Sequence, residues 1–299
     1  MKTITDPQDI PFRFEEEPDQ PEIWWRETVR MFFMNKAAVG GFVGLVIIIL
    51  IGLFGPIFFE ADPFAIIGLP LTEPGEISLL GTDYLGRNVF TGIIYGVRTT
   101  LAIAATATAF TVFIGISIGA LAGFYGGKID NALMRFAEFF QVLPPLVFAM
   151  VIVAVFTPNL MVVIFAIGIT SWTTEARLTR AEFLKIKERE YVLAARAVGA
   201  KNMRLILKVV LPNALPPLII AITLRIGMSI IYEAALSFLG LTDPDVMTWG
   251  KMIGLSRDFF FEAWWTVTFP GLAILLTVLC IALIGDGLND AFNPKLRGR

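Results

Sequence analysis

Long uncharged runs of hydrophobic residues, separated by shorter polar stretches, dominate this chain of 299 residues. The runs cover residues 37–59, 99–127, 139–174, 209–232 and 263–285, and only the fourth contains a charge, Arg225. A bilayer core about 30 Å thick requires about 20 residues of apolar helix, so every run can span a membrane. The run 139–174 is too long for one span and contains the turn signal Thr157-Pro158-Asn159, which divides it into two helices. The pattern therefore predicts an all-α membrane protein with six transmembrane helices.

Composition supports a membrane protein and excludes several kinds of catalytic site. Hydrophobic residues make up 56% of the chain and charged residues 17%, against about 45–50% and about 25% in soluble domains. The chain has no histidine and one cysteine, Cys280, so a Ser-His-Asp triad, a His-ligated metal and an intrachain disulfide are excluded. No basic tract resembles a nucleic-acid footprint. We therefore expect no catalytic residue, no metal site and no nucleic-acid partner.

The distribution of lysine and arginine predicts the orientation. Basic residues concentrate in the N-terminal segment, between the second and third spans, in the segment 177–208, and at the C-terminus. The positive-inside rule then places both termini in the cytoplasm. The acidic start of the chain, with Glu15, Glu16 and Glu17, does not resemble a signal peptide. Tryptophans of the outer segments are expected to anchor at the membrane interface; these are Trp249, Trp264 and Trp265.

The segment 177–208, between the fourth and fifth spans, is far longer than an ordinary helix connection of about 2–8 residues. Its residues are good helix formers, and Gly199 interrupts them as a helix end would. The helix before Gly199 combines a cationic side with small and apolar residues; these are Arg189, Tyr191, Val192, Ala194, Ala195, Arg196, Ala197 and Val198. Such a helix can dock in a groove of another protein. Composition alone equally allows a basic surface loop that only enforces topology.

One spacing in this segment resembles the signature of ABC importer permeases. Ala194-Ala195 is followed after three residues by Gly199 and, after nine more, by the residues 209–212, VVLP. The family pattern is Glu-Ala-Ala, three residues, Gly, nine residues, Ile, one residue, Leu-Pro. Leu193 stands in place of the glutamate and Val209 in place of the isoleucine. The leucine removes any role for a carboxylate at that position but does not affect docking.

Further stretches resemble the C-type permeases of dipeptide, oligopeptide and nickel importers. They lie in topological order and cover the chain from about residue 25: GTDYLGRN at 81–88, GGKID at 126–130, Met134-Arg135, FPG at 269–271, GDGLNDA at 285–291 and NPK at 293–295. Asn88 replaces the usual aspartate of the first stretch.

The resemblance implies a type I ABC importer permease fold in the bacterial inner membrane. This chain would pair with a homologous permease to enclose a translocation path for di- or oligopeptides, and an external solute-binding protein would deliver the solute. Two separate ATPase subunits would bind ATP and magnesium, which agrees with the lack of a G-x-x-x-x-G-K-[ST] phosphate loop here. We expect no cofactor in this chain. The residues implied to contact an ATPase are Glu190, Tyr191, Ala194, Ala195, Arg196 and Gly199.

Arg225 is the charge within a span, and two roles are open to it. It can line the path and meet the solute, or it can form a pair between helices or subunits. Glu233 on the same span lies eight residues away, about 12 Å along a helix, so direct pairing with it is not expected.

The alternatives to a peptide importer are a nickel or other small-solute ABC permease, an ion-coupled secondary transporter, and a membrane scaffold or assembly factor with no transport role. The transporter would usually show intramembrane carboxylates and inverted repeats, which are not evident. We divide the chain into a cytoplasmic tail and interfacial segment (1–36), a first span with an external loop (37–98), a five-helix core containing the coupling segment (99–290) and a cytoplasmic tail (291–299).

Overall fold

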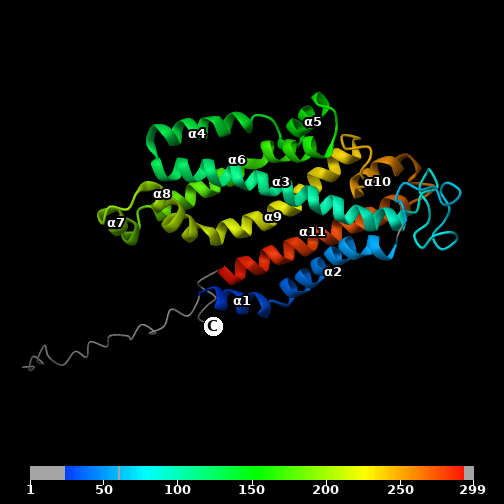
Figure 1. Ribbon diagram of the computed structural model, residues 1–299, viewed down its shortest axis with the longest axis horizontal. Helices are drawn as coiled ribbons and strands as arrows, with labels where there is room; N and C mark the ends of the chain where they lie inside the picture. Colours follow the sequence, from blue (N-terminus) through cyan, green and yellow to red (C-terminus); the bar gives the residue numbers. More distant parts are fainter. Residues whose placement is uncertain (1–23, 60, 293–299) are drawn as a thin grey trace, which may run out of the picture.

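The computed structural model describes residues 24–59 and 61–292, and this part of the chain is almost entirely helical (Figure 1). The helices are α1 (Trp24–Met34), α2 (Lys36–Phe58), α3 (Val89–Tyr125), α4 (Gly127–Phe140), α5 (Pro145–Val155), α6 (Leu160–Ile186), α7 (Glu190–Ala197), α8 (Asn202–Leu205), α9 (Leu211–Phe238), α10 (Trp249–Ser256) and α11 (Trp265–Phe292). A π-helical turn, Ile206–Val210, joins α8 to α9. Within the described residues only isolated β-bridges occur, so the predicted all-α class is confirmed.

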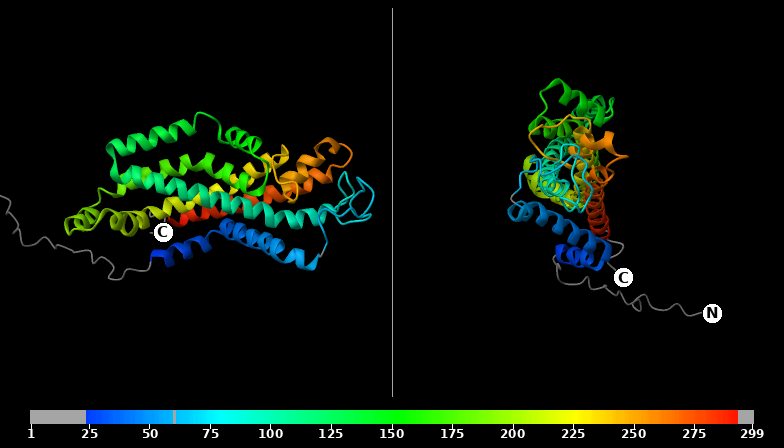
Figure 2. Two further views of the ribbon diagram at one scale, coloured as in Figure 1. Left: turned by 45° about the horizontal axis from the view of Figure 1, so that its top comes forward. Right: turned by 90° about the vertical axis from the view of Figure 1, so that its right-hand side faces the viewer.

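The long helices run side by side along the long axis of the molecule (Figures 1 and 2). The short helix α7 projects at one end, and α10 and the loop after α2 form the other end. The described chain begins at α1 and ends at α11, and both of these ends point toward the α7 side (Figure 1). One side of the bundle thus carries the segment 187–210 and both described chain ends.

Five helical segments are long and apolar enough to cross a membrane, and a bent helix pair makes a sixth candidate. The five are Lys36–Phe58, Val89–Tyr125, Leu160–Ile186, Asn202–Phe238 and Trp265–Phe292. The sixth is α4 with α5, which meet at a bend of 73°. The predicted third span thus corresponds to a bent pair of helices that begins at Gly127, before the expected residue 139. Pro144 and Pro145 break the helix at the bend, because a proline disfavours helical geometry in the residue before it.

The first core helix begins at Val89, earlier than the expected start at residue 99. Asn88 causes this start, since its side-chain oxygen accepts hydrogen bonds from the N–H groups of Phe90 and Thr91 at 3.0 and 3.4 Å. Asparagine is among the strongest N-cap residues, so it replaces the usual aspartate without loss of this role.

Helices α3 and α6 pack with their backbones in close approach, and three glycines of α3 make this possible. A Cβ atom on Gly119 would lie 2.3 Å from the carbonyl oxygen of Ala176, and Cβ atoms on Gly115 and Gly123 would meet α6 at 2.6 Å. Small residues at every fourth position allow membrane helices to pack this tightly. The spacing of this 115–119–123 motif is visible in the sequence, but only the packing shows which helix it faces.

The end opposite α7 is a packed cap in which two tryptophans belong to the core. Trp249 is 1% exposed, and its Nε1–H donates to the carbonyl oxygen of Ile93 at 3.0 Å. Trp265 is also buried, and its Nε1–H donates to the carbonyl oxygen of Thr82 at 3.2 Å. The prediction of interfacial anchors is therefore wrong for these two residues, because Trp249 packs against α3 and Trp265 packs against the loop that precedes α3. Only Trp264 remains half exposed.

The loop before α3 is ordered around Asp83. Its carboxylate accepts hydrogen bonds from the N–H groups of Leu85 and Arg87 at 2.9 and 2.8 Å. Burial raises the pKa of Asp83 above its usual value, and the two backbone donors oppose that rise. The segment GTDYLGRN is thus a structured turn that leads into α3.

Candidate functional site

The helix α7 is held against the bundle by one buried residue on its inner face. Val192 is fully buried and belongs to a hydrophobic cluster with Phe183 of α6 and Leu205 of α8. Ile206 and Val210 of the π-helical turn complete this contact. A helix of eight residues is too short to be stable alone, so this packing maintains it.

Gly199 ends α7 in a Schellman motif. Its φ is +91°, in the left-handed region that favours glycine. The N–H of Gly199 donates to the carbonyl of Arg196 at 3.0 Å, and the N–H of Ala200 donates to the carbonyl of Ala195 at 3.1 Å. These are the 5→2 and 6→1 hydrogen bonds of the motif. The spacing of alanine and glycine in the sequence signature therefore corresponds to the backbone hydrogen bonds that end α7.

The outer face of α7 is exposed and largely apolar. Tyr191, Leu193 and Val198 are 47%, 44% and 90% exposed. Five of the six predicted contact residues are exposed: Glu190, Tyr191, Ala194, Arg196 and Gly199. The sixth, Ala195, is half-buried and packs against the inner hydrophobic cluster.

The predicted contact set omits Leu193 and Val198, although Val198 is among the apolar residues expected to fill a groove on a partner. Val192, also expected in that groove, is buried against the bundle, so this expectation is wrong for Val192. Helical spacing places Leu193 about 100° around α7 from Val192. Val198 follows the last residue of α7 as its C-cap. Arg196 lies over the ring of Phe124, with the guanidinium carbon 5.7 Å from the ring centre.

A π-helical turn connects α8 to α9. The N–H of Leu211 donates to the carbonyl of Ile206, one residue further back than in an α-helix. Pro212 follows and has no N–H to donate, so the helical hydrogen-bond pattern is already interrupted here. Such turns are typical of functional regions, and this one lies where the exposed segment re-enters the bundle.

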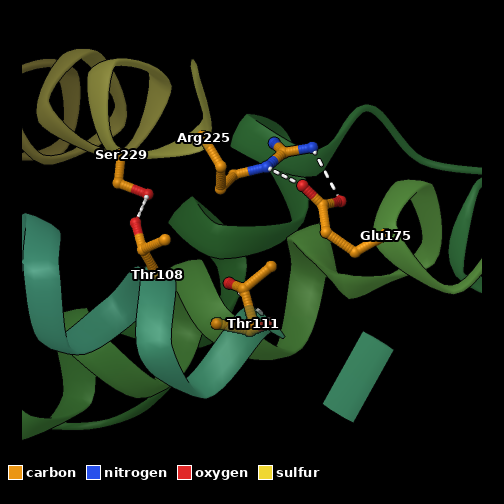
Figure 3. Close-up of polar contacts among 6 residues, drawn as sticks. Thr108, Thr111, Glu175, Arg225 and Ser229 are labelled. Atoms are coloured by element: carbon orange, nitrogen blue, oxygen red, sulfur yellow. Dashed lines mark hydrogen bonds and ion pairs between the residues drawn. The ribbon is translucent and has the colours of Figure 1, made fainter. Parts of the chain in front are cut away.

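Arg225 of α9 forms an ion pair with Glu175 of α6 within the membrane region (Figure 3). Its Nε and Nη2 atoms lie 2.7 and 3.0 Å from the two carboxylate oxygens. Of the two roles left open for Arg225, a pair between helices matches this geometry, and Glu175 is the partner. The carboxylate of Glu233 instead accepts from Ser237 at 2.6 Å. Glu175 lies at the edge of an apolar run, which is why sequence reasoning did not place it within the membrane.

A second polar contact lies one helical turn from this ion pair. The hydroxyls of Thr108 on α3 and Ser229 on α9 are 2.9 Å apart and buried (Figure 3). Within residues 24–59 and 61–292, no group of Cys, Asp and Glu side chains is arranged to hold a metal ion.

Two family models match the chain. The model described as "Binding-protein-dependent transport system inner membrane component" matches residues 115–298. The model described as "N-terminal TM domain of oligopeptide transport permease C" matches residues 24–71. The first covers α6, the α7 segment and α9, and the second covers α1, α2 and part of the following loop.

Curated relatives are similar over nearly the whole chain. The di/tripeptide transport system permease protein DppC of Pseudomonas aeruginosa is 40% identical over 91% of this chain and 92% of its own length. The oligopeptide transport system permease protein OppC of Bacillus subtilis is 35% identical over 91% of this chain and 90% of its own length. In the MetNI methionine ABC transporter, solved in inward-facing conformations, one chain shares the fold with a TM-score of 0.57. It is 20% identical, and the match covers 68% of this chain and 97% of that chain. The chain therefore belongs to the family of binding-protein-dependent transport system inner membrane components, with the fold of a type I ABC importer permease, and it is a multi-pass membrane transport subunit rather than an enzyme.

Proposed function

We propose that this chain is one of two homologous permeases in an ABC importer that carries di- or oligopeptides across the bacterial inner membrane. The observation that carries the proposal is similarity over nine-tenths of the chain to permeases whose names specify dipeptides, tripeptides or oligopeptides. Nickel is not favoured. The family assignment leaves no support for an ion-coupled secondary transporter, since an ABC importer draws its energy from separate ATPase subunits.

The proposal assigns α7 to the contact with one ATPase subunit. The helix projects from the bundle (Figure 1) and presents the apolar side chains of Tyr191, Leu193 and Val198 to the exterior. An apolar helix face that nothing covers is suited to a groove on a partner. Arg196 and Glu190 at its rim would fix the orientation of docking.

The α7 side would be cytoplasmic, and with it both ends of the described part of the chain. The segment from Arg177 to Lys208 is rich in lysine and arginine, and the positive-inside rule places such segments in the cytoplasm. The opposite cap with α10 would then face the solute-binding protein. The path-lining role predicted for Arg225 remains a prediction, and its side chain, 13% exposed, is mostly enclosed by this chain alone.

Co-purification of the intact complex from its own host tests the ATPase contact. Val198→Glu places a charge within the proposed docking surface, so we expect the ATPase subunit that contacts α7 to be lost while the second permease is retained. Phe261→Glu is the matched control, since Phe261 is 98% exposed at the opposite end of the molecule. Retention of both ATPases by Val198→Glu and by Tyr191→Glu would reject the assignment of α7.

The solute is tested by competition in proteoliposomes that contain the complex and its binding protein. Uptake of a radiolabelled dipeptide or tetrapeptide, inhibited by unlabelled peptide and unaffected by Ni²⁺, supports a peptide importer. Uptake of Ni²⁺ that peptides do not inhibit would favour the nickel alternative.

A further inference from the structure

The two helices that flank α7 are tied together by the ion pair between Glu175 and Arg225. A turn at residues 187–189 leads from α6 into α7, and the chain returns through α8 and the π-helical turn into α9. We propose that this pair positions α6 and α9 relative to each other, so that a displacement of α7 moves them as one body. The inference rests on the proposed contact between α7 and an ATPase.

The geometry of the pair is suited to fixing the relative orientation of two helices. Two hydrogen bonds, at 2.7 and 3.0 Å, join the planar guanidinium to both carboxylate oxygens. A bidentate contact restricts rotation as well as distance, which a single hydrogen bond does not. The side chain of Glu175 is 5% exposed and that of Arg225 13% exposed. Because each charge would be costly to leave alone in this environment, the two helices have a strong tendency to stay together.

Helix α3 completes this arrangement. Gly115 leaves room for Glu175, since a Cβ atom on the glycine would lie 2.6 Å from the Cβ atom of Glu175. On α9, Ser229 follows Arg225 by one turn and contacts Thr108 of α3 at 2.9 Å. α9 therefore contacts α6 through Arg225 and α3 through Ser229, while α3 and α6 are already in close approach (Figure 3).

The ion pair lies well inside the bundle from the α7 end. At 1.5 Å per residue, Glu175 is about 16 Å from the end of α6 at Ile186, and Arg225 is about 21 Å from the start of α9 at Leu211. Between the pair and α7, the two helices meet through apolar side chains of the cluster around Phe183 and Val210. Apolar contacts can slide, whereas the bidentate ion pair opposes independent rotation of the two helices.

The test measures solute transported per ATP hydrolysed by the assembled importer in proteoliposomes. Glu175→Gln and Arg225→Gln remove the ion pair, and the exchange Glu175→Arg with Arg225→Glu restores it in reverse. We expect each single variant to retain both ATPases and to transport about tenfold less solute per ATP. We expect the exchange to recover most of the loss. A role in folding alone would lower the amount of complex and leave this ratio unchanged.

Asp130→Asn is the matched control. This variant breaks a different ion pair of α6, the one between Arg180 and Asp130 of α4. It should leave the amount of solute transported per ATP unchanged. The proposal is overturned if Glu175→Gln transports as much solute per ATP as the wild type. It is also overturned if the exchange variant assembles but does not recover this ratio. A loss confined to the Arg225 variants would instead indicate contact with the solute, and it also overturns the proposal. If Glu175→Gln does not assemble, Glu175→Asp replaces it under the same criteria. Purification of the wild-type chain without ATPases would reject the proposed function itself.

Discussion

Ala195 and Ala200 are joined across Gly199 by a 3.1 Å hydrogen bond from the N–H of Ala200 to the carbonyl of Ala195. The bond closes the end of α7 and turns the chain toward α8. Both alanines are half-buried and pack against the same hydrophobic cluster as Val192. The alanine and glycine of the sequence signature thus act first on the shape of the segment, and the residues 196–199 between the two alanines stay exposed.

Gly199→Ala should destabilise the end of α7. An alanine at φ +91° costs about 1–2 kcal/mol, because its Cβ meets its own backbone in the left-handed region. No neighbouring atom lies within 4 Å of the added methyl group, so the effect is purely on the backbone. Faster amide hydrogen exchange across residues 190–200 would be the direct sign, with weaker retention of the ATPases. Gly271→Ala is the control, since that glycine has equally open surroundings and an ordinary φ; unchanged exchange in Gly199→Ala would contradict the motif.

Gly119→Ala should lower the thermal stability of the detergent-solubilised protein. The added Cβ would lie 2.3 Å from the carbonyl oxygen of Ala176, so α3 and α6 must separate. Overpacking of this kind costs about 1–3 kcal/mol. Gly40→Ala on α2 adds the same methyl group with no atom within 4 Å and should have little effect. Equal melting temperatures for the two variants would show that the close approach does not contribute to stability.

Trp249→Ala should disrupt the cap opposite α7. The ring is almost fully buried, and its removal also leaves the hydrogen bond to Ile93 unmade. Loss of a buried aromatic ring typically costs about 3–5 kcal/mol. Trp264→Ala removes a ring that is 51% exposed and should cost much less. Thermal unfolding followed by fluorescence measures both variants, and similar losses would argue against a core role for Trp249.

Asp83 should make the stability of the protein depend on acid pH. Because burial raises its pKa in the folded state, folding favours the protonated carboxyl group. That stabilisation is complete below the usual value of 3.8 and is lost as pH rises through the higher folded pKa. The free energy of unfolding of the wild type should therefore fall relative to that of Asp83→Asn as pH increases above about 3.8. Chemical unfolding at several pH values from 3.5 to 6.5 measures this shift, and a constant difference would contradict it.

Much of the fold was predictable because the membrane imposes simple length and polarity requirements. The runs 37–59 and 263–285 correspond closely to α2 and α11, since an apolar helix of that length has few other stable environments. The third span was not predictable as α4 with α5. Periodicity and hydropathy do not reveal how Pro144 and Pro145 bend the chain by 73°. The start of α3 was missed because the capping of Asn88 precedes the apolar run.

The α7 segment was identified from a short spacing, and its role as a docking helix remains a prediction. The spacing could not show which face of α7 is buried, because this depends on which side chains contact the rest of the bundle. The structure turns Val192 and Ala195 inward and leaves Leu193 and Val198 exposed.

The sequence by itself determined the membrane environment, the number of candidate spans, the basic segment at one side and the family signature. These properties follow from local composition and spacing, which tertiary contacts do not alter. Only the tertiary structure decided that Arg225 meets Glu175, that Trp249 is buried and that α3 and α6 touch at Gly119. Each of these joins residues distant in sequence, and the partner is selected by how the helices pack rather than by any local preference.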